Sequence, residues 1–295
     1  MSFFYFFFFL KKRFFFRNTL IFSAQNSIAS ILLSKVLNYK ILVRNGNHPL
    51  GSLIYSENKF FSLISFFLKL IVYNFSNKII CNSNQSTEFF KKFIFPKSKV
   101  KFIANSTISS KSEISKTREN FIITAGRLSK QKDIQTLIKA FHLFSKKKTN
   151  YKLIIMGEGK LKVKLLELCN KLKIFKKVIF KNFVKNPKKL ISLSKVYVCT
   201  SLYEGLPNSI IEALNFGTPV ISSDCKSGPK EILKNGEYGY LFPIRNYHVL
   251  YRKLIYVCDN YDKAISKTKK GQKSLDRFKV NKVSHQYIKE INKLF

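Results

Sequence analysis

The chain alternates short apolar runs with longer stretches in which apolar residues recur at helical spacing. Runs of four to eight residues indicate buried strands, and the longer periodic stretches indicate helices. The expected strands are 20–23, 40–44, 78–82, 99–103, 121–125, 151–156, 178–183, 196–200 and 219–222. The expected helices are 27–37, a long helix that passes through Phe67, and 86–93, 134–145, 161–172, 187–193, 209–216 and 280–295. Strands that alternate with helices in this way predict parallel sheets in an α/β fold.

One polar segment interrupts this alternation. Residues 106–120 are rich in Ser, Lys, Thr and Glu and contain few large apolar residues, so we expect them to be an interdomain linker. The sequence therefore predicts two Rossmann-like, doubly wound domains, at 1–105 and 121–279, and a final helix at 280–295 that is able to pack back on the first. A ligand would bind at the carboxyl ends of the strands, in the cleft that the two domains face.

Two apolar segments bear on membrane contact. Residues 3–10 are apolar and precede a basic run, which reverses the order of a secretory signal, and they are too short to span a bilayer. Residues 60–75 are interrupted by Ser62, Ser65 and Lys69 and fall short of the roughly 20 residues that a span needs. Two interpretations of 60–75 stay open, a buried helix, which we favour, and a helix lying on a membrane surface.

The formal net charge of +38, from 54 Lys and Arg against 16 Asp and Glu, raises the question of an anionic partner. Lys, Asn, Ile and Phe are enriched along the whole chain, and no RNP-type motif concentrates charge beside aromatic residues. We therefore expect no nucleic-acid partner. Weak peripheral attraction to anionic membrane lipids is the expected by-product of the charge.

Cysteine and histidine residues give no metal or disulfide pattern. The five cysteines are scattered and lack a C-x-x-C pair, and the four histidines show no ligand spacing. This usage predicts a reducing, cytoplasmic location and no structural metal.

Two glutamates eight positions apart mark the most informative segment, which runs from Glu204 to Val220. Gly205 lies in a loop that enters a helix, and a helix N-terminus offers amides and a positive dipole end to a diphosphate, while a nearby carboxylate can bind ribose hydroxyls. Simpler interpretations stay open. Glu212 and Ser209 have the spacing of a capping box, Glu204 could be a solvated loop acid, and Gly205 could be a turn residue.

A second segment follows the strand at 121–125. Arg127 and Lys132 would emerge at its carboxyl end, where a guanidinium fork and a mobile ammonium can neutralise a pyrophosphate. Ordinary surface charge is the alternative. Gly157 follows the strand at 151–156, where a small residue lets a ligand approach the backbone, although an isolated G-x-G is weak evidence.

Together these segments resemble the GT-B glycosyltransferases of the family 4 type, the glycosyl transferases group 1. The resemblance runs from Phe121 to about Pro243. It rests on Gly126-Arg127-Leu128, Lys132, Met156-Gly157-Glu158-Gly159, the pair Glu204 and Glu212, Gly217-Thr218-Pro219-Val220, Ser227-Gly228-Pro229 with Glu231-Ile232, and Gly239.

The resemblance implies a hexosyltransferase-like enzyme whose nucleotide-sugar-binding domain is 121–279. It places Arg127 and Lys132 on the donor diphosphate, Glu212 on the ribose, Glu204 near the hydroxyls of the donor sugar, the amides of Gly205 and Leu206 at the donor, and Phe183 and Val184 beside the base. It implies retention of anomeric configuration and no metal or cofactor beyond the nucleotide diphosphate sugar as donor. The expected acceptor is lipid-linked or a polysaccharide, in cell-envelope glycan or lipopolysaccharide synthesis at the cytoplasmic membrane face.

Residues 23–49 and 80–105 resemble the later part of the family's acceptor domain, and we find neither its opening strand nor its Gly-rich turn before Thr19. The first domain is therefore expected to be incomplete. His48 follows the strand at 40–44 and is the candidate acceptor-side group that touches the transferred sugar, which makes Glu204 and His48 the candidate catalytic residues. A turn histidine beside Pro49 is an equally supported interpretation of His48. The alternative function is a truncated, inactive relative that binds only nucleotide or a partner.

Overall fold

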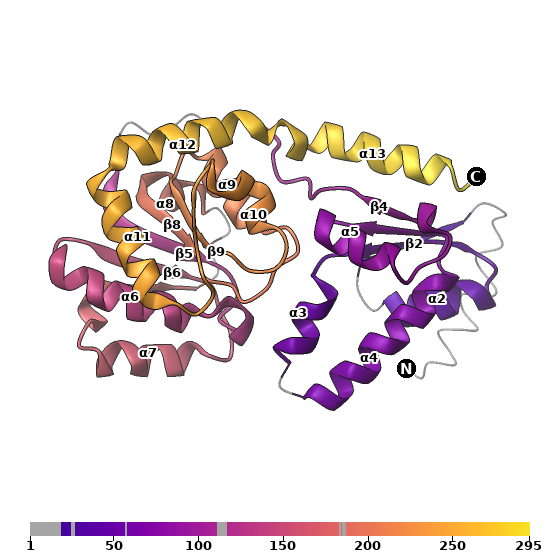
Figure 1. The fold of residues 1–295 in the computed structure, drawn as a ribbon, viewed down its shortest axis with the longest axis horizontal. Helices are drawn as coiled ribbons and strands as arrows, with labels where there is room; N and C mark the ends of the chain where they lie inside the picture. The colour runs from indigo at the N-terminus through magenta and orange to yellow at the C-terminus, as the bar shows by residue number, and fades with distance from the viewer. Residues whose placement is uncertain (1–18, 25–26, 57, 111–116, 183, 185–186) are drawn as a thin grey trace. The chain divides into compact units, whose positions relative to one another are not determined.

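The computed structural model describes residues 19–24, 27–56, 58–110, 117–182, 184 and 187–295. The chain divides into two compact units (Figure 1). The first unit comprises Met1–Gly46, Asn58–Ile103 and His285–Phe295, and the second comprises Asn47–Glu57 and Ala104–Ser284. Each unit holds one parallel sheet with helices around it, so the α/β class predicted from the hydrophobic pattern is confirmed.

The sheet of the first unit has four described strands in the order β1-β2-β3-β4. They are β1 (Leu20–Ser23), β2 (Lys40–Asn45), β3 (Lys78–Cys81) and β4 (Val100–Phe102), and all pairs are parallel. The helices are α2 (Ser27–Val36), α4 (Lys59–Val72) and α5 (Asn84–Lys91), with one-turn helices at Tyr73–Phe75 and Lys97–Lys99. Ile31, Ile41, Val43, Tyr73 and Phe90 form the centre of its core.

Helix α4 corrects two expectations. The long helix expected through Phe67 is two helices, α3 (Pro49–Ile54) and α4, and α4 begins at Lys59 because the side chain of Asn58 accepts a hydrogen bond from the amide of Phe61 (3.3 Å). The expectation that 60–75 forms a buried helix is wrong for most of α4. Its exposed apolar side chains are Phe60, Phe61, Leu63, Ile64, Phe67, Leu68 and Ile71. The helix carries apolar side chains around its whole circumference, whereas the neighbouring elements cover only one of its faces.

The sheet of the second unit has six described strands in the order β10-β9-β8-β5-β6-β7. They are β5 (Glu119–Ala125), β6 (Lys152–Met156), β7 (Val178–Lys181), β8 (Ser194–Cys199), β9 (Val220–Ser223) and β10 (Tyr240–Phe242), and all pairs are parallel. The chain adds β6 and β7 on one side of β5 and then returns to add β8 on the other. This reversal creates a topological switch point at the carboxyl ends of β5 and β8, where open α/β sheets bind ligands.

Helices cover both faces of this second sheet (Figure 1). They are α6 (Ile134–Lys147), α7 (Lys162–Lys171), α8 (Lys188–Leu193), α9 (Asn208–Asn215), α10 (Pro229–Ile232), α11 (Tyr247–Asp259) and α12 (Tyr261–Lys273). Ile122 of β5 packs in the core with α6, α7 and α11, and its neighbour Ile123 packs in the core with α8, α9 and α10. Alternation of side chains along a strand explains how consecutive residues serve two cores.

Two short segments belong to a different unit from the residues that precede them in the chain. Residues 47–57 were expected in the first domain, but Asn47 forms an isolated antiparallel bridge with Gly205, and the amide of His48 donates to the carbonyl of Glu204 (3.3 Å). Helix α13 (Val280–Asn292) starts in the second unit, while its part from His285 belongs to the first, where Lys78 Nζ lies 2.7 Å from Glu290 Oε2. The final helix was expected to be able to pack back on the first domain, and its part from His285 lies there. The place of residues 47–57 depends on non-local pairings, so sequence periodicity does not reveal it.

Candidate functional site

The connection between β5 and α6 is fixed to the connection after β6. The amide of Gly126 donates to the carbonyl of Met156 (3.0 Å), and the amide of Leu128 donates to the carbonyl of Glu158 (2.8 Å). The side chain of Leu128 is buried, whereas Arg127 beside it is exposed. The backbone thus presents the Arg127 guanidinium at the carboxyl edge of the sheet.

The loop after β8 is bound to the same connection by three hydrogen bonds. The Thr200 hydroxyl donates to the carbonyl of Lys132 (2.7 Å), the amide of Leu202 donates to the carbonyl of Gln131 (2.8 Å), and Gln131 Nε2 donates to the carbonyl of Tyr203 (2.9 Å). Neither Thr200 nor Gln131 was predicted as a site residue. Thr200 ends the strand predicted at 196–200 and Gln131 directly precedes Lys132, and these positions were the available signal.

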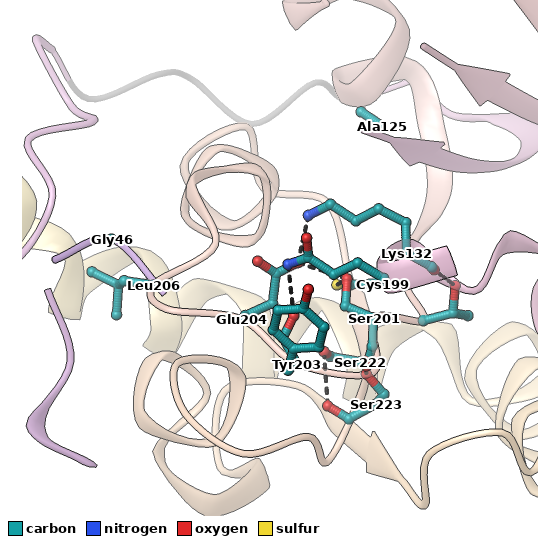
Figure 2. Close-up of polar contacts among 12 residues, drawn as sticks. Gly46, Ala125, Lys132, Cys199, Ser201, Tyr203, Glu204, Leu206, Ser222 and Ser223 are labelled. Atoms are coloured by element: carbon teal, nitrogen blue, oxygen red, sulfur yellow. Dashed lines mark hydrogen bonds and ion pairs between the residues drawn. The ribbon is translucent and has the colours of Figure 1, made fainter. Parts of the chain in front are cut away.

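These bonds bring Lys132 and Glu204 together in an ion pair between Nζ and Oε1 (Figure 2). Glu204 is only 5% exposed, and the Ser201 hydroxyl also donates to its Oε1 (2.6 Å). Burial acts to lower the pKa of Lys132, but the charge of Glu204 and its hydrogen bond outweigh burial, so this pKa is raised. Lys132 is therefore a fixed cation at neutral pH. The interpretation of Glu204 as a solvated loop acid is wrong.

Glu212 is the fifth residue of α9, which begins at Asn208. Pro207 occupies the N-cap position and no side chain caps the helix, so the Ser209–Glu212 capping box is not formed. The Ser209 hydroxyl instead interacts with that of Tyr197. Burial raises the pKa of Glu212, which lies half-buried one turn into the helix.

A hollow of about 480 Å³ lies at the ends of β5 and β6. It is lined by Ala125, Gly126, Arg127, Met156, Gly157, Glu158, Val184 and Pro187. Gly157 has φ +139°, and an added β-carbon there would overlap the carbonyl oxygen of Gly126. Three predicted donor residues, Arg127, Gly157 and Val184, thus line one space, which we call the donor hollow. Phe183, expected beside Val184, lies outside the described residues.

The loop that precedes α9 is held from several sides. Asn105 Nδ2 donates to the carbonyl of Leu206 (2.8 Å) and to Asn208 Oδ1 (2.7 Å), and the Ser227 hydroxyl donates to the carbonyl of Gly205 (3.2 Å). The side chain of Leu206 is buried. Asn105 and Ser227 therefore set the course of the backbone at Gly205 and Leu206. That the amides of these two residues contact the donor stays a prediction.

His48 is 5% exposed and directly precedes α3. Burial lowers the pKa of its imidazole, and the charge of Lys226 lowers it further. The imidazole is therefore neutral at pH 7. The structure brings the backbone of His48 to that of Glu204, while contact of the imidazole with a transferred sugar stays a prediction.

Comparisons with known proteins add to this geometry. Residues 105–274 match the family described as glycosyl transferases group 1. A glycosyltransferase of Methanocaldococcus jannaschii is 36% identical over 70% of this chain and 54% of its own length. The Campylobacter jejuni N-acetylgalactosamine-N,N'-diacetylbacillosaminyl-diphospho-undecaprenol 4-alpha-N-acetylgalactosaminyltransferase is 31% identical over 80% of this chain and 67% of its own length. The chain thus spans about half to two thirds of these two relatives.

Solved structures share the fold. TarM of S. aureus, determined with UDP among its ligands, aligns over 97% of this chain and 58% of its own, with a TM-score of 0.82 and 19% identity. Anabaena HepE in complex with UDP-glucose aligns over 93% of this chain and 78% of its own, with a TM-score of 0.79 and 20% identity. The family match spans more than half of the chain and contains Arg127, Lys132, Glu204 and Glu212. The chain therefore belongs to the glycosyl transferases group 1 family and has the GT-B class of fold.

Proposed function

We propose that the chain transfers a sugar from a nucleoside diphosphate sugar, of which a UDP-sugar is the first to test, to a lipid-linked or polysaccharide acceptor of the cell envelope. The observation that carries the proposal is the ion pair between Lys132 and Glu204 at the switch point, next to the donor hollow. The names of the C. jejuni relative and of the HepE complex, which contain a diphospho-undecaprenol acceptor and UDP-glucose respectively, support these substrate classes.

The diphosphate of the donor would lie against Arg127 and Lys132. A guanidinium fork and a part-buried ammonium that stays charged stabilise negative charge as it develops on the leaving diphosphate. The start of α9 adds its positive dipole end. The chain's own cations would thus neutralise the leaving group, and the proposal assigns no metal or other cofactor to this step.

The nucleoside and the sugar would occupy the two sides of this diphosphate. Val184 and Gly157 in the donor hollow leave room for the flat base, and the carboxylate of Glu212 would accept hydrogen bonds from the ribose hydroxyls. Glu204 would orient the donor sugar through its hydroxyls, with His48 on the acceptor side. Lys132 and Ser201 both donate to Oε1 of Glu204, which fixes the carboxylate as an orienting group, and the proposal keeps the expected retention of anomeric configuration.

Among the described helices, α4 is the one whose exposed apolar side chains fit contact with the membrane that would hold a lipid-linked acceptor. None of the described helices is long and apolar enough to cross a membrane. Phe60 and Phe61 are 69% and 68% exposed and begin an apolar helix surface that carries Lys59 and Lys69. Such a helix lies in the interface of an anionic bilayer. We propose peripheral binding of this kind at the cytoplasmic face.

Isothermal titration calorimetry with UDP and UDP-sugars tests the donor assignment. We expect Arg127→Ala to weaken UDP binding by about tenfold or more, because a hydrogen bond to a charged group contributes about 1.5–3 kcal/mol. Lys152→Ala is the matched control, since it removes an exposed cation at the opposite end of β6. Equal affinities for the unchanged protein and the Arg127→Ala variant would refute the diphosphate site. An enzymatic assay with an NMR readout of the product anomer tests retention.

A further inference from the structure

A second hollow, of about 640 Å³, lies in the second unit. Its walls come from the end of α3, the start of α6, helix α7 and the loop before α11. Its charged and aromatic lining residues are Tyr55, Lys130, Asp133, Lys139, Lys164 and Arg245. None of these residues has a role in the donor site, and we call this space the basic hollow.

The charge of the basic hollow favours an anion. Lys130, Lys139, Lys164 and Arg245 are exposed cations, and among the described lining residues the single carboxylate is that of Asp133. Asp133 is buried and accepts a hydrogen bond from the Thr136 hydroxyl (2.7 Å). Burial raises the pKa of Asp133, while nearby Arg245 and Lys139 act to lower it. The four cations are thus exposed at the hollow, whereas the carboxylate of Asp133 is buried in its lining, so the open space is positively charged.

One cation of the hollow is held in place. The guanidinium of Arg245 lies 5.4 Å from the ring centre of Tyr55, and the Tyr55 ring stacks on that of Tyr203 (5.8 Å between centres, 5° between planes). Arg245 has φ +61° and Asp133 has φ +44°, a region that residues other than glycine seldom adopt. Two unusual backbone conformations at one hollow are typical of sites where the surrounding structure fixes side chains for a ligand.

Part of the lining is apolar. Leu161, Leu165 and Leu168 of the α7 region and Ile54 of α3 line the hollow beside the cations. A free inorganic anion would leave the exposed parts of this apolar lining in contact with water. A ligand with an anionic group attached to an apolar body would contact both the cations and the apolar lining.

The basic hollow adjoins the donor hollow through one segment. Gly126 and Arg127 line the donor hollow, whereas Ser129, Lys130 and Asp133 line the basic hollow, and the buried Leu128 lies between them in the chain. The Tyr203 ring against Tyr55 belongs to the residue directly before Glu204. A ligand in the basic hollow is therefore held by the same two loops that carry the Lys132–Glu204 pair.

We propose that the basic hollow binds the phosphate or diphosphate group of a lipid-linked acceptor. Lys130 and Arg245 contact the phosphate oxygens, and the leucines of the α7 region contact the first carbons of the lipid. The assignment of this ligand as the acceptor rests on the proposed transferase function. The binding of an anionic amphiphile rests on the hollow alone.

Farnesyl diphosphate is the probe, used on the full chain below its micelle concentration and with UDP at saturation to occupy the donor hollow. We expect calorimetry to detect binding, and Lys130→Ala with Arg245→Ala to raise the Kd more than tenfold. The control Lys263→Ala with Lys269→Ala removes the same charge from exposed positions of α12 and should leave the Kd unchanged. Equal losses in the two double variants, or no binding at all, would overturn the proposal.

Two further probes separate the sources of affinity. Inorganic pyrophosphate and neutral farnesol should each bind at least tenfold more weakly than farnesyl diphosphate, and pyrophosphate binding as tight as that of farnesyl diphosphate would refute the role of the apolar wall. The donor assignment is measured separately. If no nucleoside diphosphate or its sugar binds while the binding of farnesyl diphosphate still depends on Lys130 and Arg245, the transferase function is wrong and the amphiphile site stands. If UDP binding depends on Arg127 but the affinity for farnesyl diphosphate does not change when Lys130 and Arg245 are replaced, only the proposed amphiphile site is wrong.

Discussion

Lys132 and Glu204 lie 72 positions apart in the chain and form a part-buried ion pair at the switch point of the second sheet. The pair joins two loops of the proposed donor site, one after β5 and one after β8. The Ser201 hydroxyl holds the Glu204 carboxylate within the loop after β8, and the Thr200 hydroxyl donates to the carbonyl of Lys132 in the loop after β5. The same contact thus sets both the charge of the site and its shape.

Replacing one partner of this ion pair should destabilise the fold more than replacing both partners together. We expect Glu204→Gln to lower the free energy of unfolding by about 3 kcal/mol, the low end of the range for buried pairs, because it leaves the part-buried Lys132 without a counter-charge. The double variant Lys132→Met with Glu204→Gln should recover much of that loss. Urea denaturation of the two single variants and the double variant gives the coupling energy. A coupling energy near zero would contradict the described pair.

Glu212 should distinguish nucleotides by their ribose. We expect Glu212→Gln to weaken UDP binding by about 10- to 100-fold, since a hydrogen bond to a charged group contributes about 1.5–3 kcal/mol. Binding of 2′,3′-dideoxy-UDP, which lacks the hydroxyls, should be weak already and change little. Calorimetry with both nucleotides measures the difference. Parallel losses for UDP and dideoxy-UDP would show that Glu212 acts on the fold and not on the ribose.

Helix α4 should govern vesicle binding. Replacing Phe60 and Phe61 by Ser is expected to reduce partition into anionic vesicles by roughly tenfold or more, because burying one such side chain contributes about 1.5–3 kcal/mol. Val163→Ser with Phe175→Ser is the control, since those exposed apolar residues lie in the second unit. Sedimentation with vesicles of phosphatidylglycerol and phosphatidylcholine measures partition. Unchanged sedimentation of the α4 variant would rule out this surface as the membrane contact.

His48 should make stability depend on pH below neutrality. Its folded-state pKa lies below the usual value of 6.5, so the unfolded chain binds the proton more readily and acid favours unfolding. The stability that the neutral imidazole contributes is present above pH 6.5 and is lost as pH falls toward the lowered pKa. The slope has an upper limit of about 1.4 kcal/mol per pH unit.

His48→Gln should therefore flatten the pH dependence between pH 7 and 5, measured as the free energy of unfolding in urea. The pKa of His142 is also lowered by burial. The variant His142→Gln therefore shows how much a second histidine with a lowered pKa contributes to the pH dependence of unfolding. A pH profile of His48→Gln that runs parallel to that of the unchanged protein would show that His48 is not buried in its neutral form.

The local pattern of apolar residues was enough to predict nine of the ten described strands. β1 was expected at its observed bounds, and β5 and β8 were predicted to within two residues, because short apolar runs have few other stable arrangements in a soluble domain. The pattern failed for β10, α11 and α12, which were not predicted. β10 has only three residues, and α12 is largely polar, so neither carries a strong periodic signal.

The sequence by itself determined the α/β class and the order along the chain of nine of the ten described strands, because strand periodicity is a local property. It also supplied the residues of the proposed donor site, because motif spacing is local too. Only the tertiary structure decided what those residues do together. Glu204 is buried and paired with Lys132. Helix α9 begins at Asn208, so the capping box of Ser209 and Glu212 does not form. Most apolar side chains of α4 are exposed. Burial and pairing depend on neighbours far away in the chain, and no local pattern specifies those neighbours.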